Sequence, residues 1–137
     1  MTAQRALAEK SCLTLSHNSI LIVDDDPAML RIMNIILSRS GYNVFQAMNG
    51  EVALDILRRD EVEVDLVVAD IIMPGMAGGE LMREARKHRP ECKFLFCSGY
   101  AEHTSDFLRS DEHAPTLAKP FSPDALKSAV SAALESA

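Results

Sequence analysis

The residues best suited to chemistry in this sequence stand directly after short apolar runs. Three consecutive aspartates follow the first run, and an aspartate, a serine and a lysine follow three later ones: Asp24, Asp25, Asp26, Asp70, Ser98 and Lys119. Crowded carboxylates repel one another and resist burial, so they either lie on a solvated loop or hold a cation. An ammonium and a hydroxyl beside them can bind phosphoryl oxygens. The set therefore suits phosphoryl transfer that depends on a hard cation such as Mg²⁺.

Apolar runs that suit strands alternate with amphipathic patterns that suit helices along most of the chain. The runs cover residues 20–23, 43–47, 65–69, 93–97 and 115–118. The first, third and fourth runs are continuously apolar, as expected for strands buried on both faces, whereas the second and fifth are interrupted or short, as is typical of edge strands. The pattern predicts an α/β fold: a flavodoxin-like (βα)5 three-layer sandwich around a parallel five-stranded sheet of order 2-1-3-4-5.

Helices are predicted between and after these strands, because apolar residues recur there at the spacing of one helix face. These residues are Met29, Ile32, Met33, Ile36 and Leu37, then Val52, Ala53, Ile56 and Leu57, then Leu81, Met82 and Ala85, and finally Leu126, Ala129, Val130, Ala133 and Leu134. Gly41 is a natural stop for the first helix, and Ser122 is a suitable N-cap for the last. Only Phe107 and Leu108 suggest a helix within residues 102–113, so we expect that element to be short or mobile.

In this strand order the carboxyl ends of the first, third, fourth and fifth strands are neighbours, and ligands of such sheets bind beyond those ends. The polar residues that follow these strands should therefore meet at one rim. Two carboxylates there would hold Mg²⁺, a third would attack phosphorus to form an aspartyl phosphate, and Lys119 and Ser98 would bind the transferred group. Asp26 stands before Pro27, where we expect it to cap the first helix.

The composition predicts one globular domain of 137 residues, of which 47% are hydrophobic. A net charge of −6 argues against direct binding to nucleic acid. The three cysteines, Cys12, Cys92 and Cys97, form no C-x-x-C pair and favour a reducing cytoplasm. No apolar run approaches the ~20 residues of a membrane span and no signal-peptide pattern opens the chain, so we expect a cytoplasmic protein without membrane contact.

Four segments of the sequence match a known family in order and spacing: LIVDDDP, DLVVADIIMPGMAGGEL, FCSGYA and LAKPF. They resemble the signature segments of bacterial response-regulator receiver domains. The resemblance covers about residues 19–137 and leaves residues 1–18 as an N-terminal extension. It implies a signalling phosphoprotein of a two-component system or phosphorelay. Such a domain is not an enzyme in the usual sense, because it catalyses only its own phosphorylation and dephosphorylation.

The resemblance also implies a role for each carboxylate of the rim. Asp70 would be the phosphoacceptor that becomes a 4-aspartylphosphate. Asp25 would bind Mg²⁺ directly, and Asp24 would do so largely through water. Asp70 itself and the main-chain carbonyl of Ile72 would complete the protein ligands.

The switch that the resemblance implies departs from the usual pattern of the family. Ser98 would turn towards the phosphoryl group, Lys119 would pair with that group, and the Lys119–Pro120 bond would be cis. Thr116 stands where such receivers usually carry Tyr or Phe. Tyr100, two residues beyond the switch serine, is the candidate to replace that aromatic side chain.

Partners follow from the same resemblance. A histidine kinase or a histidine phosphotransferase would donate the phosphoryl group from a phosphohistidine. A downstream effector protein would then bind the face built from residues 102–113, the fifth strand and the last helix, and homodimerisation stays open. The sequence fits a stand-alone regulator and the receiver of a hybrid kinase nearly equally well.

Two alternatives belong to other functional classes. One is a small Mg²⁺-dependent phosphatase of the haloacid dehalogenase type, in which Asp24 would be the nucleophile and Asp26 the acid/base. The absence of a second acidic motif after Lys119 argues against it. The other is a pseudo-receiver that binds partners without phosphorylation, but the loss of an acid or of the lysine, its expected mark, is absent.

Overall fold

The computed structural model describes residues 18–99 and 114–135, in which strands and helices alternate. The elements are β1 (Ser19–Val23), α2 (Pro27–Arg39), β2 (Asn43–Ala47), α3 (Gly50–Leu57), β3 (Leu66–Asp70), α4 (Gly78–His88), β4 (Phe94–Ser98), β5 (Thr116–Ala118) and α6 (Pro123–Glu135). Each strand begins and ends within one residue of its predicted bounds. The helix suggested within residues 102–113, residues 1–17 of the expected N-terminal extension, and Tyr100 lie outside the described residues. None of the described helices is long and apolar enough to cross a membrane.

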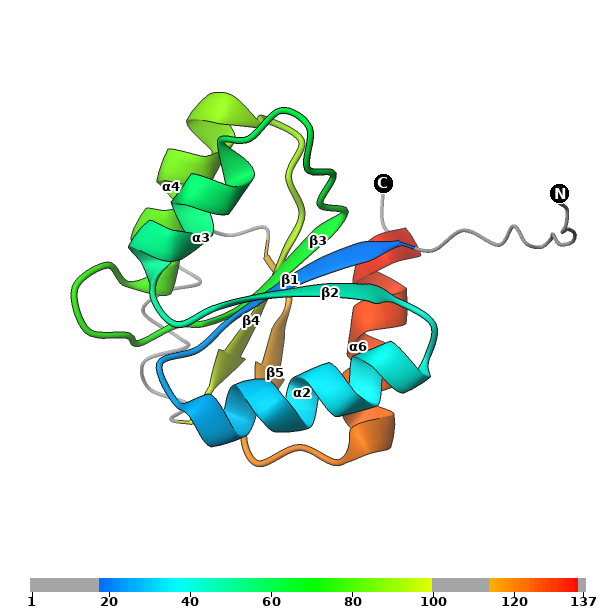
Figure 1. The fold of residues 1–137 in the computed structure, drawn as a ribbon. Helices are drawn as coiled ribbons and strands as arrows, with labels where there is room; N and C mark the ends of the chain where they lie inside the picture. The colour runs from blue at the N-terminus through cyan, green and yellow to red at the C-terminus, as the bar shows by residue number, and fades with distance from the viewer. Residues whose placement is uncertain (1–17, 100–113, 136–137) are drawn as a thin grey trace, which may run out of the picture.

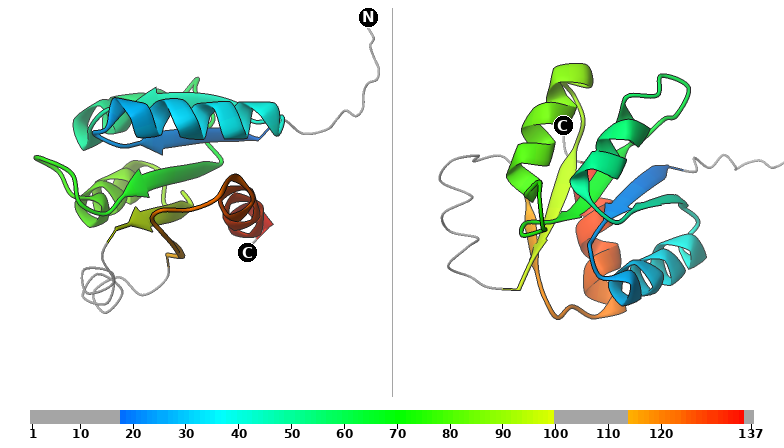
Figure 2. Two further views of the ribbon diagram at one scale, coloured as in Figure 1. Left: turned by 90° about the horizontal axis from the view of Figure 1, so that it is seen from below. Right: turned by 60° about the vertical axis from the view of Figure 1, so that its left-hand side comes forward.

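All five strands form one parallel sheet in the order β2-β1-β3-β4-β5, which confirms the predicted order. Helices α2 and α6 cover one face of the sheet, and α3 and α4 cover the other (Figures 1 and 2). The strands β1 and β4 are buried at every residue, whereas β2 and β5 at the two edges are largely exposed or half-buried. The flavodoxin-like three-layer arrangement is therefore confirmed.

The two faces of the sheet form two separate hydrophobic cores, because successive side chains of a strand point to opposite faces. In β1, Leu21 and Val23 pack with α3 and α4, whereas Ile20 and Ile22 pack with α2 and α6. The same alternation runs along β3 and β4. Burial on both faces explains why these three strands are continuous apolar runs in the sequence.

The predicted starts and stops of the helices are confirmed at three places. Asp26 caps α2 by accepting a hydrogen bond from the main-chain N–H of Ala28 at 3.0 Å. The Ser122 hydroxyl accepts one from the N–H of Ala125 at 3.0 Å at the start of α6. Gly41 ends the first helical segment with a φ of +98°, a conformation that glycine adopts without steric cost.

The predicted apolar face of α2 is wrong in one respect. Ile32 was expected among its packed residues but is 49% exposed. The helix buries Met33 and Leu37 of the predicted face together with Leu30, because it meets the sheet along that row of residues. Likewise, Val52 of α3 is 41% exposed. Apolar residues on α2 and α3 extend beyond the face that contacts the sheet. The sequence pattern alone therefore does not show which of them are buried.

We expect Asp26→Ala to lower the free energy of unfolding by about 1 kcal/mol, the usual cost of losing a helix N-cap. The side chain is exposed and caps α2, whereas the main-chain N–H that Asp26 donates to Asp24 survives the change. Urea denaturation measures the effect. Asp26→Asn is the control, since asparagine caps as well as aspartate; an equal loss in that variant would contradict a capping role.

Candidate functional site

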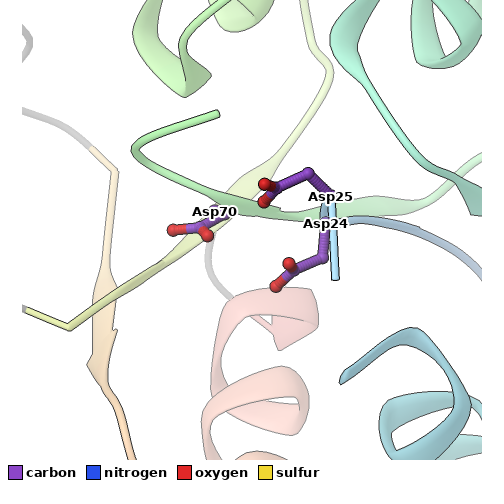
Figure 3. A group of neighbouring side chains, drawn as sticks. All are labelled: Asp24, Asp25 and Asp70. Atoms are coloured by element: carbon purple, nitrogen blue, oxygen red, sulfur yellow. The ribbon is translucent and has the colours of Figure 1, made fainter. Parts of the chain in front are cut away.

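The carboxylates of Asp24, Asp25 and Asp70 converge at the carboxyl end of the sheet, as predicted. One oxygen from each lies within 4.8 Å of the others. The pairing of β1 with β3 brings them together, because Val23 lies opposite Ala69 and both chains continue directly into their aspartates. Figure 3 shows the three carboxylates as near neighbours.

Lys119, which follows the edge strand β5, pairs with two of these carboxylates. Its Nζ lies 3.0 Å from Oδ2 of Asp24 and 3.2 Å from Oδ2 of Asp70. The residue follows β5, and its main-chain N–H donates to the carbonyl of Ser98 at 2.8 Å. The Lys119–Pro120 peptide bond is cis, as the resemblance implied. The lysine therefore reaches across β4 and β3 to the end of β1, and neutralises part of the acidic rim.

Asp24 is buried and its two oxygens are both occupied. The residue is 1% exposed. Its Oδ1 accepts a hydrogen bond from the main-chain N–H of Asp26 at 2.9 Å, and its Oδ2 pairs with Lys119. Asp25, by contrast, is exposed. The structure thus separates two adjacent aspartates: one is bound within the protein, and the other faces solvent.

The Asp26 N–H is a contact that the sequence-based prediction missed, since Asp26 was expected only to cap a helix. Aspartate side chains often accept a hydrogen bond from the residue two positions ahead, and this tendency is the available sequence signal. Asp26 therefore contributes twice: its side chain starts α2, and its main chain orients the Asp24 carboxylate.

Burial raises the pKa of the Asp70 carboxyl above its ordinary value, although the charge of Lys119 and its hydrogen bond act in the opposite direction. The Asp24 charge adds to the rise. For Lys119, burial lowers the pKa, but the hydrogen bond and charge of Asp24 together with Asp70 outweigh it and raise the pKa of the ammonium. Lys119 is therefore a permanent cation at neutral pH, and Asp70 is a carboxylate that the protein solvates poorly.

The remaining predicted residues lie on β4 and β5 or directly beyond β3. Ser98 ends β4 and is 6% exposed, and Thr116 begins β5 opposite Phe96. Ile72, two residues beyond the acceptor, is 50% exposed, and its main-chain N–H donates to Oδ1 of Asp70 at 3.4 Å. Residue 116 thus brings a small hydroxyl side chain to the strand beside β4, as the sequence requires, at the position where the family pattern has an aromatic ring.

The neighbouring Cys97 contributes no nucleophile. Burial raises the pKa of its thiol to about 12, with the charges of Asp70 and Asp24 adding to the rise against Lys119. The thiolate is the reactive form of cysteine, so this residue is inert at neutral pH and belongs to the hydrophobic core.

In the absence of divalent ions, we expect Asp70→Asn to be more stable than the wild type at pH 7. Because the pKa of Asp70 is higher in the folded protein than its ordinary value of 3.8, ionisation of the carboxyl costs stability. That cost is complete above the raised pKa and absent below about pH 3.8. Urea midpoints of both proteins, measured from pH 7 down to pH 4, should therefore converge. A gap that stays constant or widens towards acid would contradict the raised pKa.

The donor set fits a hard divalent cation. Carboxylate oxygens are the ligands that Mg²⁺ prefers, and the ion keeps several waters, for which the exposed side of Asp25 leaves room. Lys119 pairs with two of these acids, and the buried Ser98 ends β4, the strand next to that of Asp70. The fold and the site together define an α/β domain with a carboxylate–lysine centre at the carboxyl end of its sheet, suited to metal-assisted phosphoryl chemistry.

Comparison with known proteins identifies the family. The family model described as "response regulator receiver domain" matches residues 20–131, and the chain belongs to this family. It is 32% identical over 119 residues to sporulation initiation phosphotransferase F of Bacillus subtilis, an alignment that covers 85% of this chain and 93% of that protein. Over 136 residues it is 38% identical to sensor kinase CckA of Brucella abortus. That alignment covers 98% of this chain but only 14% of the kinase.

A solved structure extends the comparison to the metal site. The response regulator TrrA from Thermotoga maritima, solved in complex with Mg²⁺ and BeF, is 33% identical. The match has a TM-score of 0.73 and covers 84% of this chain and 97% of that one. These findings support a phosphoacceptor signalling domain over the phosphatase and the pseudo-receiver. The acidic cluster of this chain is a group that can hold a metal ion.

Proposed function

We propose that this receiver domain accepts a phosphoryl group on Asp70 from a phosphohistidine, in a reaction that requires Mg²⁺. The observation that carries the proposal is the Lys119 ammonium, which lies within 3.2 Å of the acceptor carboxylate while Asp25 stands exposed beside it. A poorly solvated carboxylate next to a fixed cation is a suitable nucleophile, because the surroundings hold the charge of the incoming group without reorganisation.

In the proposed step an oxygen of Asp70 attacks phosphorus, and the bond between phosphorus and the donor imidazole nitrogen breaks. The imidazole leaves with the electron pair and takes up a proton. Asp25, Asp70 and the main-chain carbonyl of Ile72 would hold Mg²⁺, with Asp24 acting through water because both its oxygens are engaged. When bound, the ion supplies positive charge to the phosphoryl oxygens.

Lys119 changes partner during this step in our proposal. It starts between Asp24 and Asp70 and then pairs with a phosphoryl oxygen, as Ser98 donates its hydroxyl to another. Because residue 116 is threonine, β5 carries no aromatic side chain that could change position together with Ser98. We propose that Tyr100 takes this role. The effector would bind the surface of β5 and α6, and a homodimer is a second form of output.

The histidine kinase or phosphotransferase is proposed as the donor because relatives include a sensor kinase and a sporulation phosphotransferase. We also propose that the reaction takes place in the cytoplasm, in keeping with the cysteine pattern of the sequence. The chain spans only 14% of the related kinase. The proposal therefore concerns the receiver domain, whether it acts alone or within a longer protein.

The deciding experiment is phosphorylation with acetyl phosphate and Mg²⁺, followed by mass spectrometry that locates the labile phosphoryl group. Wild type and the control Asp60→Asn, which removes an exposed acid that pairs with His88 outside the carboxylate cluster, should be labelled on Asp70. Asp70→Asn should not be labelled. Labelling that survives this substitution, or that appears on Asp24, would overturn the proposal, and the second result would favour the phosphatase.

A further inference from the structure

We propose that Gly78, the first residue of α4, is a positioning residue for the phosphoacceptor. Its missing side chain lets the start of α4 pack directly against the main chain of Asp70, and this contact sets where the Asp70 carboxylate and the Ile72 carbonyl lie. The inference rests on the proposed function, since it concerns the same site. Gly78 itself touches neither the metal nor the phosphoryl group.

The main chain beyond Asp70 is held on two sides. The N–H of Ile71 donates to the carbonyl of Cys97 in β4 at 3.1 Å. The carbonyl of Ile71 accepts from the N–H of Gly78 at 2.8 Å. The loop 71–77 therefore closes on its own first residue, and Ile71 is clamped between β4 and the start of α4. Its two neighbours in the chain are the acceptor and the proposed carbonyl ligand.

A side chain at position 78 has no space. A Cβ built on Gly78 would lie 2.6 Å from the carbonyl oxygen of Asp70, 2.9 Å from Cε1 of Phe96 and 3.1 Å from Cα of Ile71. Two of these three neighbours are main-chain atoms of the acceptor segment, and the third belongs to a fully buried ring. The buried Phe96 ring cannot turn aside in a close-packed core, so the added methyl group presses on the main chain of Asp70 and Ile71 and shifts it.

Gly50 provides a matched control at the start of the adjacent helix. It is also the first residue of its helix and is also buried. A Cβ there would lie 2.9 Å from both Cβ and Sδ of Met76, so the crowding falls on a methionine side chain, six residues beyond Asp70. Alanine at either position should cost stability, but only alanine at position 78 presses on the main chain of Asp70.

The first test is Mg²⁺ affinity, measured by calorimetry on the unphosphorylated protein. We expect Gly78→Ala to raise the Kd for Mg²⁺ about tenfold, and to slow labelling by acetyl phosphate at least as much, because small misplacements of reacting groups have large effects. Gly50→Ala should leave the Kd within about threefold of the wild type. An unchanged Kd in Gly78→Ala, or an equal rise in Gly50→Ala, would overturn the inference.

The second test separates the two clashes. Phe96→Leu removes the ring atom that crowds position 78 but leaves the Asp70 carbonyl where it is. In the Phe96→Leu background, Gly78→Ala should cost less stability than it does in the wild type. It should still lower the Mg²⁺ affinity as much, when the double variant is compared with Phe96→Leu alone. Recovery of the affinity would show that the ring, and not the acceptor main chain, is the cause.

A measurement on the wild type keeps the inference testable if Gly78→Ala does not fold. Mg²⁺ should slow hydrogen exchange of the Gly78 amide about tenfold. That amide donates to the carbonyl of Ile71, which lies between the acceptor Asp70 and the proposed ligand Ile72. The Arg89 amide at the other end of α4, bonded to Ala85, is the internal reference and should not respond. Equal responses would contradict the inference. Absence of labelling on wild-type Asp70 would refute the proposed function instead.

Discussion

Asp25→Asn should lower Mg²⁺-dependent phosphorylation by about 100-fold or more, which corresponds to roughly 3 kcal/mol of transition-state stabilisation. Asp25 is the exposed carboxylate of the cluster, and among the residues that the structure describes no side chain pairs with it. Asp24 is a poorer replacement, because its two oxygens already bind the Asp26 N–H and Lys119. The rate of labelling by acetyl phosphate at several Mg²⁺ concentrations measures the effect.

Asp26→Asn is the matched control for this experiment. It removes the same charge one residue further along and preserves the helix cap. Labelling in that variant should stay within about twofold of the wild type, since Asp26 acts on Asp24 through its main chain. Equal losses in both variants would show that the net charge of the rim, and not a ligand at position 25, controls the reaction.

Asp25→Asn should also stabilise the metal-free protein. Asp24, Asp25 and Asp70 repel one another across less than 4.8 Å, and removal of one charge relieves that repulsion. The urea midpoint of Asp25→Asn should therefore exceed that of the wild type without Mg²⁺, and the gap should shrink at high salt. The acidic rim would then be a feature retained for function at the expense of stability.

Lys119→Met should lower the free energy of unfolding by about 3 kcal/mol at pH 7 without Mg²⁺, because it leaves buried Asp24 without a cation. Mg²⁺ should restore more stability to this variant than to the wild type, since the ion replaces part of the lost charge. Urea denaturation with and without Mg²⁺ measures both effects. We also expect labelling to slow by at least about tenfold, through loss of the cation next to Asp70.

The control is Lys127→Met on α6. Lys127 pairs with exposed Asp124 at 3.5 Å, so its loss should change stability by less than about 0.5 kcal/mol. A double variant, Lys119→Met with Asp24→Asn, should recover part of the loss, because no buried charge then remains unpaired. Equal effects of the two lysine substitutions would contradict a buried ion pair.

The pH dependence has a defined sign. The pKa of Lys119 is raised in the folded protein above its ordinary value of 10.5. Its contribution to stability is therefore complete below about pH 10.5 and is lost as the pH rises through the raised pKa. The stability gap between wild type and Lys119→Met should therefore close only in strongly alkaline solution.

Much of the fold is determined by the sequence alone. Strands buried on both faces require continuous apolar runs, and edge strands do not, so the burial of β1 and β4 and the exposure of β2 could be predicted without a structure. Helix caps are equally local, because Asp26 and Ser122 act on residues two or three positions away. The strand order then placed the acids, the serine and the lysine on one rim.

Only the tertiary structure decided how those residues divide their roles. Asp24 and Asp25 are chemically identical neighbours, but Lys119, ninety-five residues beyond Asp24, meets the first and leaves the second in solvent. The exposure of Ile32 likewise depends on how α2 lies on the sheet. The tight fit at Gly78 arises from contacts with the end of β3 and with Phe96 in the middle of β4. Residue types and local spacing carry the chemistry of a site, but burial and close approach depend on segments that meet only when the chain is folded.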